Sequence, residues 1–161
     1  MLLNSGYGVK DKLLLIMTQE EKDLLIKDLC ARLPYGVVVE HCSGIRGTLH
    51  DLFVHWCYDE NDVMHDREAF TSTFFGDDDC DISKFKPYLF PLSSMTEAIK
   101  DEIYQETGLY DIFENDQIHI EVGTNFADVF KLFNILNKYN LDYNGLIPLG
   151  LANDATGLNI Y

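Results

Sequence analysis

The stretch TQEEKDLLIKDLCARLPYGVVVEH, residues 18–41, decides the fold, because its hydrophobic pattern changes from helical to strand spacing within a few residues. Thr18 and Glu21 have the spacing of a capping box, in which each side chain accepts a hydrogen bond from the backbone amide of the other residue. A helix is therefore predicted over Gln19–Arg32. Its apolar stripe should face the core. The stripe consists of Leu25, Ile26, Leu29, Cys30 and Leu33.

The residues after this helix predict a β-hairpin. Leu33-Pro34-Tyr35-Gly36 ends the helix, because the residue before a proline is disfavoured in helical geometry and glycine permits a turn. Val37–His41 is rich in β-branched residues and predicts a strand. The glycine-bracketed turn Ser43–Gly47 then leads into a return strand over Thr48–Cys57.

The middle of the chain gives fewer clear patterns. Residues 58–81 have no definite assignment, although part of this stretch has β character. Residues 85–91 carry aromatic side chains between two prolines, which predicts an ordered loop or an edge strand. Ser94 and Glu97 then match a second capping box, and the helix that they open should end at Gly108.

The last third predicts a strand followed by a helix. Gln117–Val122 alternates apolar and polar residues, as a half-buried strand does. A third helix is predicted over Phe126–Tyr139, and its Phe130 and Phe133 should be buried against that strand. The apolar stripe of this helix consists of Phe126, Val129, Phe130, Phe133 and Leu136.

These elements predict one α+β domain over residues 1–161, with a small, mostly antiparallel sheet of four or five strands and about three helices packed on it. Apolar residues make up 47% of the chain, near the globular average, which argues against disorder throughout. No window approaches 18 uninterrupted apolar residues, so no membrane-spanning helix is expected. The start of the chain lacks a signal-peptide pattern, and a cytoplasmic protein with free thiols is predicted.

Two interpretations of the first residues stay open. Residues 1–16 are either a real extension, in which Lys12–Ile16 adds an edge strand, or they precede an alternative start at Met17. The second interpretation rests on the capping box, which opens a helix directly after this internal methionine.

The negative charge is concentrated in two segments. The chain has a net charge of −15, to which residues 51–81 contribute −9 and residues 101–130 contribute −8. This excess argues against direct binding of nucleic acid or of an anionic membrane. We expect the two segments to lie close together and form one negatively charged face, which would steer a basic protein partner. The alternative is a solvated acidic surface that keeps the protein soluble. The carboxylates expected to contact the partner are Asp59, Glu60, Asp62, Asp77, Asp78, Asp79 and Asp81.

Weak metal-ligand patterns occur in the same region. Asp77-x-Asp79-x-Asp81 opens like a calcium loop, but Ile82 replaces the turn glycine and Tyr88 replaces the bidentate glutamate. His55-x-Cys57 places two soft ligands on one face of a strand, whereas structural zinc usually has two such pairs. A plain acidic turn and a polar strand face are the simpler interpretations, and no cofactor is expected.

Two segments resemble parts of a known group of proteins. Residues 86–97, KPYLFPLSSMTE, are similar to a KPYLRPMSSMTEEE segment, and residues 139–152, YNLDYNGLIPLGLA, are similar to an HxxDYRGLIPKGLALEA ending. Both segments are typical of proteins from phages and prophages of gut anaerobes. The resemblance implies a phage-type accessory protein and carries over no catalytic residue. Asn144 and Leu149 stand where that group has basic residues, and Tyr139 where it has histidine.

One pattern suits nucleophilic chemistry. Cys42-Ser43-Gly44 follows a predicted strand and has histidines nearby, as a Cys/His pair would require. No nucleophile elbow, cysteine-protease signature or phosphate-binding loop accompanies it. The sequence therefore favours a non-enzymatic accessory protein that binds another protein through a negatively charged face. A small metal-dependent or thiol hydrolase is the alternative, and the oligomeric state stays open.

Overall fold

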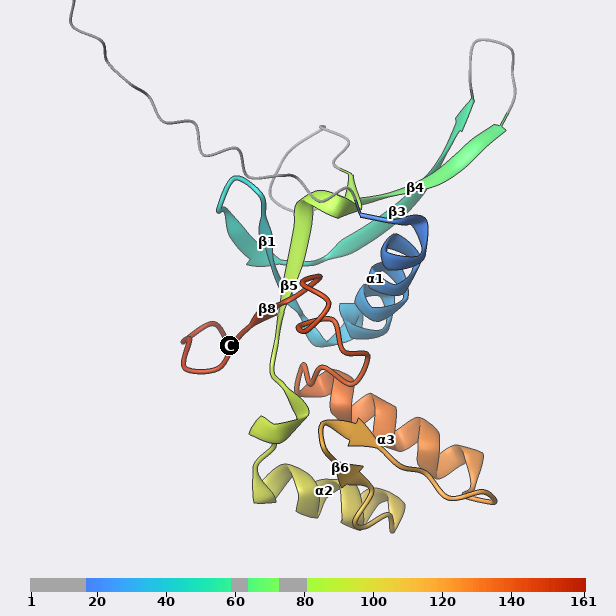
Figure 1. The fold of residues 1–161 in the computed structure, drawn as a ribbon, viewed down its shortest axis with the longest axis vertical. Coiled ribbons are helices and arrows are strands. Elements are labelled where there is room, and N and C mark those ends of the chain that lie inside the picture. Colours follow the sequence, from blue (N-terminus) through green and yellow to red (C-terminus); the bar gives the residue numbers. More distant parts are fainter. Residues whose placement is uncertain (1–16, 59–63, 73–80) are drawn as a thin grey trace, which may run out of the picture.

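The computed structural model describes residues 17–58, 64–72 and 81–161, and for 53–58 and 64–72 it describes the backbone only. In this part of the chain, three α-helices accompany a four-stranded, mostly antiparallel sheet, which confirms the predicted α+β class (Figure 1). The helices are α1 (Gln19–Arg32), α2 (Glu97–Thr107) and α3 (Phe126–Lys138). Short 3₁₀ turns occupy Leu33–Tyr35, Ile82–Lys84 and Leu92–Ser94.

The described strands form one sheet and two separate antiparallel pairs. In the sheet the order is β2-β1-β5-β8; β1 is antiparallel to both of its neighbours, and β5 is parallel to β8. The strands of the sheet are β1 (Val38–His41), β2 (Arg46–Thr48), β5 (Phe85–Leu89) and β8 (Asn153–Asp154). The separate pairs are β3 (Asp51–Tyr58) with β4 (Met64–Ser72), and β6 (Phe113–Glu114) with β7 (Gln117–Ile118).

Helix α1 has the predicted bounds, and Leu25 and Leu29 of the predicted stripe lie in its buried face. The capping box of Thr18 and Glu21 is present, with both hydrogen bonds formed. Cys30, which the apolar pattern placed in the core, is exposed, so that prediction is wrong. Two charged residues also take part in the buried face. That face consists of Leu25, Asp28, Leu29 and Arg32.

The predicted return strand is divided in two. β1 and β2 form the expected hairpin, with Val39 opposite Gly47. β3 then leaves this sheet and pairs with β4, beginning with Asp51 opposite Ser72. β4 lies within residues 58–81, the stretch that the sequence pattern did not assign.

Strand β5 is central in the sheet, although residues 85–91 predicted a loop or an edge strand. The His41 amide donates a hydrogen bond to the Ile45 carbonyl, on the β2 side of β1. Because backbone groups alternate along a strand, those of Val39 also point toward β2. Pro87 lies opposite Val39, so β1 needs no amide hydrogen from it. A proline is therefore tolerated inside the sheet at this one register.

Helices α2 and α3 occur where the sequence predicts them. The N-cap of α2 is Thr96 rather than Ser94, because Ser94 belongs to the preceding 3₁₀ turn. Gly108 ends α2 in the left-handed conformation, as predicted. Asn125 caps α3 by accepting a hydrogen bond from a backbone amide of the first turn.

The strand predicted over Gln117–Val122 is shorter than its alternating pattern suggests. β7 joins β6 through a two-residue turn in which Asn115 and Asp116 both have positive φ, as a type I′ turn requires. After Ile118 the described chain leaves the strand, and Val122 is fully exposed. The alternating pattern predicted that Ile118, Ile120 and Val122 face the core. Ile118 and Ile120 do pack against the core cluster, but Val122 does not.

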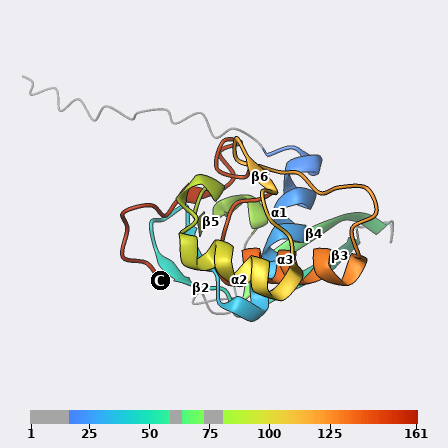
Figure 2. The same ribbon diagram turned by 90° about the horizontal axis from the view of Figure 1, so that it is seen from below.

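Two hydrophobic clusters divide the described core (Figures 1 and 2). The sheet lobe is formed by the described residues of 17–89 and by 144–161, with α1 against the sheet. The helical lobe is formed by residues 90–143, with α2, α3 and the β6–β7 hairpin. Fully buried residues of the sheet lobe include Leu25, Leu29, Phe85 and Leu146, and those of the helical lobe include Ile103, Leu132, Leu136 and Leu141.

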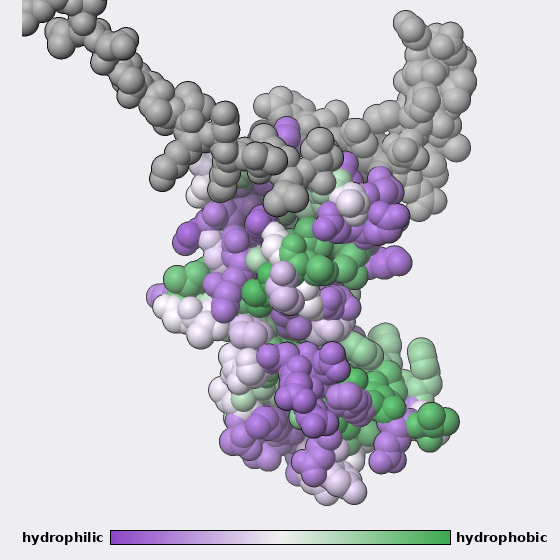
Figure 3. All heavy atoms as spheres, in the orientation of Figure 1, coloured by the Kyte–Doolittle hydropathy of each residue, from purple (hydrophilic) through white to green (hydrophobic). Residues whose placement is uncertain are grey.

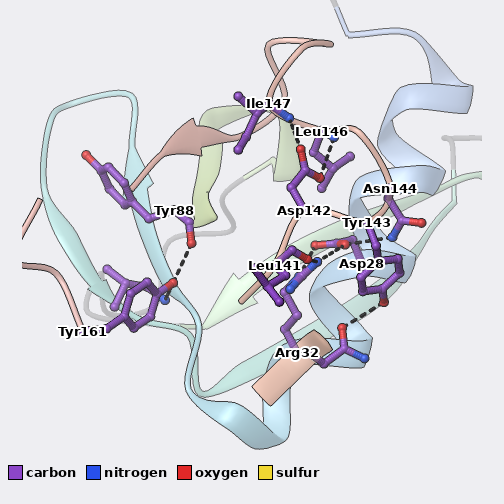
Figure 4. Close-up of polar contacts among 12 residues, drawn as sticks. Asp28, Arg32, Tyr88, Leu141, Asp142, Tyr143, Asn144, Leu146, Ile147 and Tyr161 are labelled. Carbon is purple, nitrogen blue, oxygen red and sulfur yellow. Dashed lines mark hydrogen bonds and ion pairs between the residues drawn. The ribbon is translucent and has the colours of Figure 1, made fainter. Parts of the chain in front are cut away.

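The two lobes meet where the segments 86–97 and 139–152 lie side by side. The Phe90 amide donates to the Asn140 carbonyl over 2.9 Å, and the Asp142 amide donates to the Phe90 carbonyl over 2.7 Å. The Asp142 carboxylate accepts from the amides of Leu146 and Ile147, each over 2.8 Å (Figure 4). Residues of the segments 86–97 and 139–152 therefore have a structural role at this junction.

Candidate functional site

Most of the carboxylates predicted to contact a partner cannot be placed. Asp59, Glu60, Asp62, Asp77, Asp78 and Asp79 lie outside the described residues. Asp81 is half-buried; its carboxylate caps the turn at Ser83 and lies 3.4 Å from the Lys22 ammonium. Burial alone would raise the pKa of Asp81, but these partners outweigh burial and lower it. Asp81 thus has a structural role, because it caps the 3₁₀ turn that directly precedes β5.

The metal and thiol hypotheses gain little from the described residues. Among these, no group of three or more His, Cys, Asp or Glu side chains could hold a metal ion. His55 and Cys57 lie on β3, opposite Glu68 and His65, and their side chains are outside the description. Cys42 Sγ lies 3.6 Å from His41 Nε2. His41 ends β1 and is half-buried against the Phe85 ring, whereas Cys42 is exposed, so water would have free access to any thiolate chemistry at its sulfur.

The two acidic segments do not form one face in the described structure. Strands β3 and β4, from the segment 51–81, lie at one end of the long axis, and residues 101–130 lie at the other (Figure 1). The expectation of a single merged face is therefore wrong for the described parts of these segments. The second segment must be judged alone, and every one of its residues is described.

The helical lobe carries an excess of exposed carboxylates that its lysines do not neutralise. Each of its three lysines already lies near an acid: Lys100 at 2.8 Å from Glu97, Lys131 at 3.7 Å from Asp128, and Lys138 at 2.8 Å from Glu102. Further acidic side chains of the lobe are exposed and have no ion pair with a described residue. They are Asp101, Glu106, Asp111, Glu114, Asp116 and Glu121.

Exposed aromatic residues accompany these carboxylates. Tyr104 and Tyr110 border a hollow of about 510 Å³ between α2 and the chain that follows it. Asp101 and Asp111 also border this hollow, so it is acidic as well as aromatic. The hollow is half open to solvent and has no cluster of catalytic groups, and it suits a side chain of a partner better than a substrate undergoing chemistry.

Two phenylalanines of α3 face solvent, contrary to prediction. Phe126 is 81% exposed and Phe130 is 60% exposed, so the predicted burial of Phe130 is wrong. Phe133, predicted beside it, is half-buried, and its ring meets the edge of the Tyr143 ring at 5.0 Å between centroids. The core face of α3 consists instead of Leu132, Ile135 and Leu136. Figure 3 shows the resulting hydrophobic area on one side of the helical lobe.

A buried polar cluster lies where the two lobes meet. Arg32 donates two hydrogen bonds to Asp28, over 2.7 and 2.8 Å, and a third to the Leu141 carbonyl over 2.8 Å (Figure 4). Asn144 donates to the same carboxylate over 2.9 Å, and the Tyr143 ring lies 5.1 Å from the guanidinium carbon. Asp28 and Arg32 are buried and bonded to each other, to the Leu141 carbonyl and to Asn144, although Arg32 Nη1 has no hydrogen-bond partner among the described residues. The cluster is therefore a structural junction.

Comparisons with protein-family models, with curated proteins and with solved structures found no match for this chain. None of the helices in the described part is long and apolar enough to cross a membrane. Sequence reasoning located the acidic segment 101–130 but missed the exposed phenylalanines, because it assigned the stripe that contains Phe126 and Phe130 to the core. The sequence does indicate that α3 is apolar on more than one face, because Leu132 and Ile135 lie outside the predicted stripe.

Proposed function

We propose that the chain is a non-enzymatic, phage-type accessory protein that acts in the bacterial cytoplasm by binding a basic protein through the helical lobe. The observation that carries the proposal lies between Gly108 and Phe130, where five carboxylates occur without a single Lys or Arg. The phage origin rests on the resemblance of residues 86–97 and 139–152. An accessory protein of this kind needs a recognition surface rather than a catalytic centre.

The charge distribution supports a role in recognition more than a role in solubility alone. The helical lobe keeps its lysines in ion pairs and presents its remaining carboxylates on α2, on the β6–β7 hairpin and on the loops next to that hairpin. A concentrated field of one sign accelerates the encounter with an oppositely charged protein and weakens as salt shortens the Debye length to about 8 Å at physiological ionic strength. Exposed aromatic side chains are typical of the energetic centres of interfaces.

The test compares two variants that remove the same charge from different segments. Asp111→Asn/Glu114→Gln/Glu121→Gln changes exposed residues of the helical lobe, and a second variant changes Asp77, Asp78 and Asp79 to Asn. A partner is first captured from host lysate and identified, and its association rate is then measured with each variant. We expect the first variant to slow association about tenfold, and the second to change it less than about twofold.

Each result discriminates between explanations. A larger effect of the 77–79 variant would place the interface in the first acidic segment instead. Equal effects would indicate a response to net charge alone. An association rate that is independent of salt, or the absence of any basic partner, would contradict the proposal. Stoichiometric metal in the purified protein would favour the hydrolase alternative.

A further inference from the structure

The apolar side of α3 provides a feature that charge alone does not explain. Phe126 and Phe130 are one helical turn apart and therefore lie on the same side of α3, and Val122 precedes them in an exposed loop. Phe133 continues this row toward Tyr143 at the lobe junction. We call Val122, Phe126 and Phe130 the phenylalanine patch.

The patch is too large to be an ordinary scatter of surface hydrophobic residues. A phenylalanine side chain presents roughly 200 Å², so the two exposed fractions of 81% and 60% leave on the order of 300 Å² of aromatic surface in contact with water. Apolar patches of this size on monomeric proteins are often functional. The row from position 126 to position 133 is about 10 Å long, which matches two turns of a second helix.

We propose that the phenylalanine patch is the docking site for a basic amphipathic helix of the partner protein. This inference rests on the proposed function and specifies which part of the helical lobe anchors the partner. The helix would place aliphatic side chains at i, i+3, i+4 and i+7 on the phenylalanines, as helices do when they bind an apolar surface. Its lysines and arginines would lie toward the carboxylates that surround the patch.

Charge complementarity identifies this occupant. Glu121 precedes the patch, and Asp128 lies between its two phenylalanines in the sequence. The nearest cation, Lys131, already donates to the Glu106 carbonyl over 2.9 Å and lies 3.7 Å from Asp128. Glu121, Asp128 and Lys131 together carry a net charge of −1, and Lys131 is already paired, so a helix with cationic flanks meets a net negative charge there.

A second copy of the chain fits the patch less well. Two chains that each carry a net charge of −15 would bring their acidic lobes together, at a cost in electrostatic repulsion. A stable dimer also buries roughly 800 Å² on each partner, more than twice the aromatic surface that Phe126 and Phe130 expose. A single helix needs less area and supplies the opposite charge.

The experiment uses the full chain and two synthetic peptides of about 18 residues, both built from leucine and lysine in equal composition. In the first, the leucines follow i, i+3, i+4 and i+7 spacing; in the second, the same residues are scrambled so that no apolar face forms. Binding is measured by fluorescence anisotropy. We expect the amphipathic peptide to bind at least about tenfold more tightly than the scrambled one.

Matched variants locate the binding. Phe126→Ser/Phe130→Ser should weaken binding of the amphipathic peptide at least about tenfold. Ile45→Ser/Leu149→Ser removes two half-exposed apolar residues of the sheet lobe and should change binding less than about twofold. Neither pair of substitutions should unfold the chain, since these side chains lie largely outside the core, and circular dichroism checks this.

The outcomes separate this inference from the proposed function. If both peptides bind equally and the phenylalanine variant has no effect, while removal of carboxylates abolishes binding, the acidic surface stands and the docking site is wrong. If neither peptide binds at low salt, the proposed function itself fails. A dimer in sedimentation that the phenylalanine variant dissociates would assign the patch to a second copy. An NMR contact between Phe126 and any of residues 1–16 would assign it to the chain itself.

Discussion

In most proteins charged residues are exposed and large apolar residues are buried. The two lobes make opposite exceptions to this rule. The sheet lobe buries a charged pair, Asp28 and Arg32, on the face of α1 that meets the core. The helical lobe leaves Phe126 and Phe130 in water on a helix that has a well-buried opposite side. Hydrogen bonds inside the chain satisfy the Asp28 carboxylate and two of the three Arg32 nitrogens, all but Nη1. The second exception has no satisfying contact in the described residues, and this is why we assign function to the helical lobe.

The largest expected effect comes from removing one member of the buried pair, which tests whether that pair stabilises the sheet lobe and its contact with the helical lobe. Arg32→Met leaves the Asp28 carboxylate buried without its cation, and we expect a loss of about 3–5 kcal/mol in the free energy of unfolding. Urea denaturation measures this loss. In Asp28→Leu/Arg32→Met no unpaired charge remains, so the double variant should be more stable than Arg32→Met. A single variant as stable as the wild-type chain would show that the pair does not hold the lobes together.

The two faces of α3 give the second prediction. Leu132 is fully buried, and Leu132→Ala should lower the free energy of unfolding by about 2–5 kcal/mol through lost burial and a cavity. Phe130→Ala removes a larger side chain from an exposed position and should change it by less than about 1 kcal/mol. Thermal and urea unfolding of both variants measure the difference. A large loss for Phe130→Ala and a small one for Leu132→Ala would mean that α3 is rotated.

The sequence predicted element types better than it predicted the orientation of elements. The capping box, Pro34 and Gly108 act locally, and the ends of α1 and α2 that depend on them were found almost to the residue. The buried face of α1 depends instead on a distant acceptor, the Leu141 carbonyl, which no local pattern reveals. For the same reason the apolar residues of α3 could not be divided between core and surface.

The candidate site was found in part. The charge count of residues 101–130 indicated an acidic surface, because charge is a property of composition and needs no knowledge of packing. The exposure of the phenylalanine patch, by contrast, depends on how much surface α2 and the β6–β7 hairpin cover. The single acidic face was also predicted wrongly for the described parts of the two segments, because charge counts do not show that β3 and β4 lie far from residues 101–130 along the long axis (Figure 1).

A third prediction concerns the edge of the sheet lobe. The Tyr161 hydroxyl accepts from the Val38 amide over 3.2 Å and donates to the Tyr88 carbonyl over 2.6 Å, so it bridges β1 and β5 (Figure 4). Tyr161→Phe should cost about 1 kcal/mol at neutral pH. Tyr110→Phe, which changes an exposed tyrosine of the helical lobe, is the control.

The same hydroxyl gives the sheet lobe a dependence on alkaline pH. Burial raises the pKa of Tyr161 to about 12, from an ordinary value of 10. Because the folded pKa is raised, the stability is fully present below pH 10 and is lost as the pH rises toward 12. The difference between wild type and Tyr161→Phe in urea denaturation should therefore narrow over this interval. A constant difference would mean that the bridge does not depend on the phenolic proton.

The smallest expected change in the free energy of unfolding concerns Glu102 in the helical lobe, and it should depend on acidic pH. The Glu102 carboxylate joins α2 to the end of α3, accepting from Lys138 over 2.8 Å and from the Tyr139 hydroxyl over 2.6 Å, and these bonds lower the pKa of Glu102. A lowered folded pKa contributes stability above the ordinary value of 4.5, and this stability is lost as the pH falls. Since the pair is partly exposed, Glu102→Gln should cost only about 0.5 kcal/mol at pH 7.

At pH 3 the Glu102→Gln variant and the wild type should be equally stable. The control is Glu114→Gln, which changes an exposed carboxylate without an ion pair to a described residue. This control should have the stability of the wild type at both pH values. A difference for Glu102→Gln that persists at pH 3 would show that the carboxylate charge does not connect α2 to α3.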